Sequence, residues 1–209
     1  MMKLHVAPPS PRAFKALAVA HHLGLEFELC PIDLLNGANQ RAEFVALNPN
    51  RKMPVLEDDG FVLWESNAIC QYLAAKQPDA GLLPSDSRGR ADVSRWQFWE
   101  SAHWDPACAT LVLERLLKPM FGLGDTDAAQ VAKGEDEVRR YGAVLDGWLG
   151  RRPFLCGERL TLADFAVGAW LNYAERAAYP VGDLRNVGRW YAGLVELPAW
   201  RESTVALPS

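Results

Sequence analysis

The hydrophobic pattern of the chain changes around residues 78–88, and this change is what most constrains the fold. Before it, residues 1–77 alternate short strand patterns with helical patterns, and a hairpin pattern (53–65) leads directly into a helical one. The stretch 78–88 is rich in proline and glycine, and only helical patterns follow it. The sequence therefore predicts an α+β domain (1–77), a linker (78–88) and an all-α domain (89–209).

The first domain has the element order β-α-β, then a variable stretch, then β-β-α. A buried strand is predicted over 3–7, a helix follows Ser10, and a strictly alternating strand covers 25–29. In the later hairpin, Asp59 and Gly60 are residue types that adopt the positive φ angles of a tight turn. This order of elements is the one found in thioredoxin-like domains.

The second domain carries two signals of helix boundaries. Pro106 lies inside a long helical pattern (91–117) and is expected to kink it, because proline has no N–H to donate. Thr161 and Asp164 have the spacing of a capping box at the start of a later helix. Asp164 is therefore assigned to folding, and its replacement by alanine is expected to impair folding.

Composition and charge exclude several classes of function. The 209 residues include 22 basic and 26 acidic side chains, for a net charge of −4, which does not favour a nucleic-acid partner. No stretch approaches the ~18 apolar residues of a membrane-spanning helix, and the first residues lack the pattern of a signal peptide. We therefore expect a cytoplasmic protein with no membrane partner.

Cysteine and histidine spacing predicts neither disulfides nor a metal site. The four histidines form no H-x-x-x-H pair, so no metal is expected. The cysteines are far apart and contain no C-x-x-C, so we expect them to be reduced and buried. They are Cys30, Cys70, Cys108 and Cys156.

Two places near the hairpin suggest a ligand. Pro54 stands at the start of a strand, where it cannot donate a backbone hydrogen bond to the ladder. Glu65 and Ser66 open a helix, whose first N–H groups and partial positive charge attract a carboxylate. Ser66 is also a suitable helix cap, and Glu65 carries a charge that suits the helix dipole, so a purely structural role stays open for both.

Three segments in this order, "NPNRKMPVLEDDG", "ESNAICQYL" and "LTLADFAVG", resemble the cytosolic glutathione S-transferase superfamily. The resemblance covers essentially the whole chain and is to the serine-type members (bacterial, phi, theta and tau-like). It implies a thioredoxin-like βαβ-ββα domain followed by an all-α helical bundle. It also implies a homodimeric detoxification enzyme that activates the thiol of its co-substrate glutathione for attack on small, apolar electrophiles.

The resemblance further assigns the contacts to glutathione. The Met53–Pro54 peptide bond is expected to be cis, with the backbone of Met53 pairing with the cysteinyl part of glutathione. Ser66 and Glu65 are expected to hold the γ-glutamyl carboxylate and ammonium, and Lys52 the glycyl end. Gln40 falls where relatives often carry a basic residue, so its contact would be weaker than an ion pair. The predicted set is Gln40, Lys52, Met53, Pro54, Glu65 and Ser66.

Ser10 matches the catalytic serine of serine-type transferases, a few residues after the first strand. Its hydroxyl would donate a hydrogen bond to the glutathione sulfur and favour the thiolate, which is the nucleophile. Ser10 also precedes Pro11 in the pattern of a helix N-cap, so capping is the alternative role.

A pocket for the electrophile is expected beside the long helices of the second domain, with His103, Trp104 and Leu111 as candidate lining residues. Tryptophan at helical spacing is more often part of a core, so packing is the alternative for these side chains. Two other functions stay open. One is a glutathione-dependent reductase, dehalogenase or lyase on the same fold, and the other is a binding module without catalysis.

Overall fold

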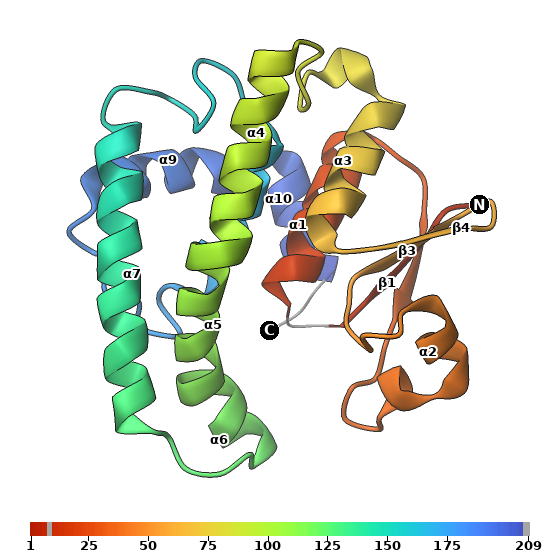
Figure 1. Ribbon diagram of the computed structural model, residues 1–209, viewed down its shortest axis with the longest axis horizontal. Coiled ribbons are helices and arrows are strands. Elements are labelled where there is room, and N and C mark those ends of the chain that lie inside the picture. The colour runs from red at the N-terminus through yellow and green to blue at the C-terminus, as the bar shows by residue number, and fades with distance from the viewer. Residues whose placement is uncertain (8–9, 207–209) are drawn as a thin grey trace. The chain divides into compact units, whose positions relative to one another are not determined.

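The structure, a computed structural model, describes residues 1–7 and 10–206 (Figure 1). It divides into two compact units. We call Met1–Ser85 together with the segment that starts at Glu196 the sheet unit, and Asp86–Val195 the helical unit. The helical unit is therefore shorter than the predicted domain 89–209, because the end of the chain packs with the first unit.

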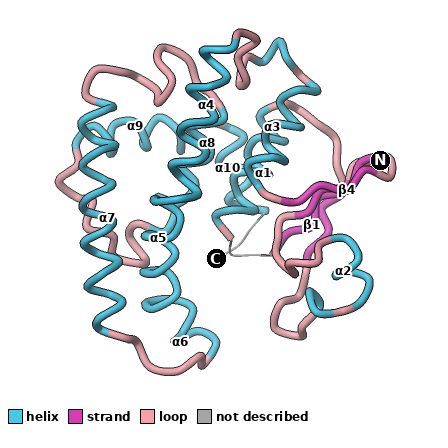
Figure 2. Tube along the Cα trace, in the orientation of Figure 1, coloured by secondary structure: helices cyan, strands magenta, loops and turns pink. Residues whose placement is uncertain are grey.

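A four-stranded sheet with the order β2-β1-β3-β4 forms the centre of the sheet unit, drawn in magenta in Figure 2. β1 pairs with β2 in parallel, and β3 pairs antiparallel with both β1 and β4. The predicted βαβ-ββα order is thus confirmed, although β2 starts later than the predicted strand 25–29. The strands are β1 (Lys3–Val6), β2 (Glu28–Pro31), β3 (Val55–Asp58) and β4 (Phe61–Trp64).

Helix α1 packs against both α3 and α10, although α10 lies at the other end of the sequence. A hydrogen bond of 2.9 Å joins His21 Nδ1 to Ser203 Oγ, and the rings of Phe14 and Trp200 lie 4.8 Å apart. Both rings are buried, which explains why the last segment belongs to the sheet unit. The helices of this unit are α1 (Pro11–His22), α2 (Ala42–Leu47), α3 (Ser66–Lys76) and α10 (Pro198–Ala206), with short 3-10 turns at Ala38–Gln40 and Pro78–Ala80.

The helical unit contains a long helical stretch that includes two π-helical turns, Glu100–Trp104 and Leu113–Leu117. Pro106 lies in the first turn of α5, and α5 follows the π-helical turn Glu100–Trp104. The wider π-helical geometry accommodates proline, which has no backbone N–H to donate. Of the residues described, no helix has the length and apolar character needed to cross a membrane. The helices are α4 (Ser87–Trp99), α5 (Asp105–Val112), α6 (Lys118–Phe121), α7 (Ala128–Leu149), α8 (Leu162–Gly168) and α9 (Arg185–Val195), with a 3-10 turn at Ala169–Tyr173.

Asp164 is the polar centre of the helical unit, and its carboxylate is fully buried. It accepts hydrogen bonds from Thr161 N (2.8 Å) and Thr161 Oγ1 (3.1 Å), which confirms the predicted capping box at the start of α8. It also accepts from Leu155 N (2.9 Å) and from the indole N–H of Trp190 on α9 (3.0 Å). One carboxylate therefore holds together a loop and two helices.

We expect Asp164 to make stability depend on pH in an unusual direction. Burial raises its pKa to about 6, despite the four donors that lower it, whereas an unfolded aspartate titrates near ~3.9. Between these two pKa values the native state binds more protons than the unfolded state. The contribution of Asp164 to the free energy of unfolding is therefore complete at low pH and is lost as pH rises through about 6.

Urea unfolding of the wild type and of Asp164→Asn over a pH series tests this expectation. The advantage of the wild type over the variant should shrink between about pH 4 and 7, by an amount on the order of 2–3 kcal/mol, and then stay constant. An advantage that grows over the same interval would mean that the four donors, rather than burial, set the pKa of Asp164.

Candidate active site

The ends of three strands bring the predicted site residues to one edge of the sheet. In β3, Val55 pairs with Trp64 of β4 and with His5 of β1. Because β1 and β4 both run antiparallel to β3, their carboxyl ends lie beside its first residue. Pro54 directly precedes β3 and Glu65 directly follows β4, so the two lie opposite each other at this edge. The connection from β1 into α1 starts at the same edge.

The Met53–Pro54 peptide bond is cis, as predicted. Pro54 is buried and Met53 is half-buried, and both precede the ladder that starts at Val55. Within residues 1–7 and 10–206, the N–H and C=O groups of Met53 make no hydrogen bond. They are therefore available to a peptide-like ligand that lies along this edge.

Ser66 is the first residue of α3 and not its cap, so the alternative capping role is wrong. The cap position falls on Glu65, whose side chain makes no capping hydrogen bond. Ser66 is 8% exposed, and its hydroxyl has no hydrogen-bond partner among the described residues. A nearly buried, unpartnered hydroxyl at a helix amino terminus is suited to an anionic ligand.

The backbone of Glu65 has φ 71° and ψ 111°, in a region that favours glycine. A residue with a side chain is held there at a cost of about 1–3 kcal/mol, and such strain is concentrated at binding sites. The Glu65 side chain is exposed, so its carboxylate is available to a cationic group. The strained backbone at Glu65 redirects the chain from β4 into α3 and places Ser66 at the edge of the sheet.

Ser10 is the N-cap of α1, and its Oγ accepts a hydrogen bond of 3.3 Å from Ala13 N. The alternative role as a cap is thus confirmed, but it does not exclude the catalytic one. Capping uses a lone pair of the oxygen, and the hydroxyl proton is left to donate. Ser10 is half-buried; its neighbours Pro8 and Pro9 lie outside the described residues.

At the predicted glycyl end, the Gln40 side chain is engaged with the protein itself. Its Oε1 accepts a hydrogen bond of 2.8 Å from Arg51 Nη1, while Asn39 Nδ2 donates to the Arg51 carbonyl at 3.0 Å. Arg51 and Lys52 are both exposed, and Arg51 has φ 57°. Sequence reasoning missed Arg51, although a second cation directly before Lys52 was a visible signal.

Asn48 is a second residue that sequence reasoning missed. It is 2% exposed, and its Nδ2 donates to the Lys52 carbonyl at 2.7 Å. Its Oδ1 accepts from the backbone N–H of Asn50 at 3.0 Å. Asn48 thus fixes the loop that carries Arg51 and Lys52 and leads to the cis peptide bond. Its position before Pro49 was the only sequence signal.

The three predicted pocket residues differ in their surroundings. Trp104 and Leu111 are fully buried in the helical unit, and the Trp104 indole donates to the Val167 carbonyl at 3.1 Å. This burial favours the alternative role in packing. His103 is exposed, and its ring stacks on Tyr141 at 5.3 Å. A role of these residues in lining a substrate pocket stays a prediction.

All four cysteines are free, as predicted. Cys70 and Cys108 are buried, but Cys30 and Cys156 are only half-buried, so the expectation of burial is wrong for these two. In the part of the chain that the structure describes, no group of three or more histidine, cysteine or acidic side chains is placed to hold a metal ion.

Two family profiles match the chain. Residues 1–75 match the glutathione S-transferase N-terminal domain, and residues 103–198 match the glutathione S-transferase C-terminal domain. Among curated proteins, glutathione S-transferase 3 of Zea mays is 35% identical, with 99% of this chain and 95% of the relative covered. A glutathione S-transferase of Hyoscyamus muticus is 33% identical, with 97% of each chain covered.

Solved structures give the same result. Glutathione S-transferase III in its apo form has a TM-score of 0.87 and 33% identity, covering 100% of this chain and 97% of the other. A theta-class glutathione S-transferase from Xanthomonas axonopodis pv. citri with glutathione bound has a TM-score of 0.89 and 28% identity, covering 97% and 96%. From its two domain matches and its full-length relatives, the chain belongs to the glutathione S-transferase family.

Proposed function

We propose that the chain catalyses the attack of the glutathione thiol on small, apolar electrophiles, with Ser10 as the hydrogen-bond donor to the sulfur. The relatives are named glutathione S-transferases, and one similar structure has glutathione bound. The observation that carries the proposal is the unpartnered polar set at one edge of the sheet. It consists of the backbone groups of Met53, the hydroxyl of Ser66 and the amino terminus of α3.

Each part of glutathione has a matching group at this edge. The Met53 backbone can pair with the cysteinyl residue as a short added strand. Ser66 and the first N–H groups of α3 suit the γ-glutamyl carboxylate, and the Glu65 carboxylate suits the γ-glutamyl ammonium. For the glycyl carboxylate we propose Lys52 together with Arg51, which Gln40 holds in place. Gln40 then acts on glutathione through Arg51.

The chemistry needs no buried general base, because glutathione brings its own nucleophile. A free thiol has a pKa near ~8.5, and a hydroxyl that donates to the sulfur lowers it by favouring the anion. The thiol proton passes to solvent, and the sulfur lone pair then forms the bond to the electrophilic carbon. In a substitution the bond from this carbon to its leaving group breaks, and the leaving group departs with the electron pair; in an addition the π electron pair moves onto the substrate and takes up a proton from solvent. Ser10 keeps its own proton throughout and can cap α1 at the same time.

Ser10→Ala tests the catalytic assignment. The pKa of bound glutathione should rise by about one unit or more, with little change in affinity, because the donor acts on the anion. Thiolate absorbance of the complex across pH measures the pKa, and calorimetry measures the affinity. Since Ser10 also caps α1, Ser10→Thr is the matched control that keeps both the cap and the donor. An unchanged thiol titration in Ser10→Ala would remove Ser10 from catalysis.

Ser66→Ala and Arg51→Gln test the binding assignments. Each variant should weaken glutathione binding by about 1–3 kcal/mol, since each removes a hydrogen bond to a charged group. Calorimetric titration with reduced glutathione gives the dissociation constants. Ser85→Ala and Arg159→Gln change exposed residues of the same types elsewhere and should leave binding as in the wild type. Wild-type affinity in Ser66→Ala would refute the site as drawn.

We further propose that the protein is a homodimer that works in the cytoplasm in detoxification. Our candidate for a subunit contact in the helical unit is Phe98 on α4, whose aromatic side chain is 75% accessible. Phe98→Glu should halve the mass measured by light scattering, whereas Leu35→Glu, at an equally exposed apolar residue, should not. A wild-type protein that is monomeric at all concentrations would contradict the dimer.

A further inference from the structure

Two neighbouring cations, Arg51 and Lys52, directly precede Met53 and its cis peptide bond at the candidate active site. Both side chains are exposed, and neither makes an ion pair with an acidic residue in 1–7 or 10–206. The side-chain partner of Arg51 is the neutral amide of Gln40, whose Oε1 lies 2.8 Å from Arg51 Nη1. Both positive charges are therefore uncompensated within the described part of the chain.

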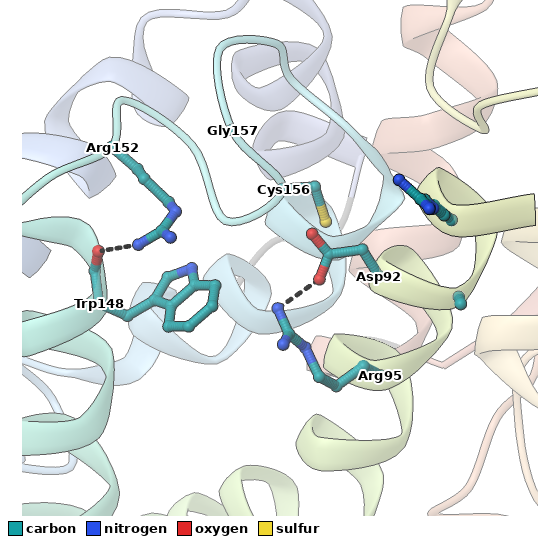
Figure 3. Close-up of a pocket in the computed structure, with 8 residues that line it drawn as sticks. Asp92, Arg95, Trp148, Arg152, Cys156 and Gly157 are labelled. Atoms are coloured by element: carbon teal, nitrogen blue, oxygen red, sulfur yellow. Dashed lines mark hydrogen bonds and ion pairs between the residues drawn. The ribbon is translucent and has the colours of Figure 1, made fainter. Parts of the chain in front are cut away.

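An arginine of the helical unit shows the contrasting arrangement. In the hollow between the start of α4, the end of α7 and the loop that follows α7, Arg95 forms an ion pair with Asp92. Figure 3 draws this pair as a dashed line. There a carboxylate of the chain neutralises the guanidinium, whereas beside the cis peptide bond the described part of the chain supplies none.

Hydrogen bonds fix the backbone from which the two cations project. Asn48, which is 2% exposed, accepts from Arg51 N through its carbonyl at 2.9 Å and donates from Nδ2 to the Lys52 carbonyl at 2.7 Å. Asn39 Nδ2 donates to the Arg51 carbonyl at 3.0 Å. Arg51 has φ 57°, a left-handed conformation that is uncommon for a residue with a side chain and is concentrated at binding sites. The loop thus presents both cations from a backbone that is set before a ligand binds.

The place of these cations follows from the direction of the bound peptide. In the complex proposed above, the γ-glutamyl carboxylate lies at the amino terminus of α3, and the cysteinyl backbone pairs with Met53. The third residue of the peptide then lies on the side of Met53 away from α3. Arg51 and Lys52, which lead into Met53, therefore belong to the end of the site that receives the third residue.

Glutathione alone does not use all of this end of the site. Its third residue is glycine, which brings one carboxylate with about four lone-pair sites. The Lys52 ammonium, the Arg51 guanidinium and the Nε2 group of Gln40 together carry more N–H donors than that, because Gln40 uses only its Oε1 on Arg51. One negative charge also meets two positive charges. This end of the site therefore has donors and charge left for a second carboxylate.

We propose that the site prefers, over glutathione itself, γ-glutamyl-cysteinyl peptides whose third residue carries a second carboxylate. The inference rests on the proposed binding of glutathione at this edge. Arg51, whose guanidinium Gln40 orients, holds the terminal carboxylate with two N–H groups, the geometry that a guanidinium favours. Lys52, a compact charge on a flexible stem, holds the carboxylate of the third side chain. Because Gln40, Arg51 and Lys52 are all exposed, a longer third residue extends into solvent.

Calorimetric titration of the full-length protein with three reduced peptides, at low ionic strength, tests the inference. The peptide γ-Glu-Cys-Glu should bind about twofold to fivefold more tightly than glutathione, the gain typical of an ion pair between exposed groups. The peptide γ-Glu-Cys-Gln has the same length but no second carboxylate, so it should bind as glutathione does. If γ-Glu-Cys-Glu binds no more tightly than glutathione or than γ-Glu-Cys-Gln, the inference is overturned.

Lys52→Gln separates the two carboxylates. In this variant the dissociation constants of glutathione and γ-Glu-Cys-Glu should differ by a factor of only about one, because the partner of the second carboxylate is gone. Arg51→Gln should weaken both peptides by a similar factor, since they share the terminal carboxylate. Lys133→Gln is the matched control, because Lys133 is an exposed lysine of the helical unit, and it should keep the wild-type preference. A preference that survives in Lys52→Gln would overturn the role of Lys52.

Ionic strength gives a second readout. Exposed charges are screened within about 3 Å at 1 M salt, so the preference for γ-Glu-Cys-Glu over γ-Glu-Cys-Gln should be lost there. A preference that persists at high salt would mean that the longer third residue gains by packing and not by charge, which would also overturn the inference.

The same titrations separate this inference from the proposed function. If glutathione and both longer peptides fail to bind, the proposed function is wrong and the inference falls with it. If glutathione binds and γ-Glu-Cys-Glu binds no more tightly, the glutathione site stands and only the preference for an acidic third residue is overturned.

Discussion

The pairing of β3 with β1 on one side and with β4 on the other is the constraint on which the candidate active site depends. It brings the end of β1, the start of β3 and the end of β4 to one edge, although β1 is far from the other two strands in the sequence. A slip of one residue in either pairing would reverse the faces of a strand. The site therefore depends on backbone register before it depends on any side chain.

At that edge, the polar groups that matter are those that folding leaves without partners. Met53 makes no backbone hydrogen bond in the described part of the chain, and Ser66 stands one residue inside a helix whose cap position does not use a side chain. Ser10 shows the complementary arrangement, because its oxygen accepts from Ala13 while its proton stays available. The fold thus offers hydrogen-bond donors and acceptors to a ligand at this edge. The amino terminus of α3 has no side-chain cap, whereas that of α1 is capped by Ser10.

Sequence reasoning succeeded where the signal was local. The turn at Asp59 and Gly60 has the predicted positive φ angles, 48° and 85°, because two adjacent residue types determine it. The capping box of Asp164 spans four residues and was equally visible. The Gln40–Arg51 hydrogen bond was not predicted, since it joins positions eleven residues apart that meet only in the folded chain. The role of Ser66 as a cap was wrong by one residue, because α3 begins at Ser66 itself and its cap position falls on Glu65.

The packing of α10 against α1 has a consequence for the synthesis of the protein. The sheet unit is interrupted by the whole helical unit and needs the segment from Glu196 to cover α1. A ribosome delivers that segment after the whole helical unit, so the sheet unit begins before the helical unit and is completed after it. Until Trp200 arrives, Phe14 on α1 has an uncovered aromatic face. The nascent chain thus exposes this apolar surface of α1 until Trp200 has been made, a period in which chaperones have a surface to bind.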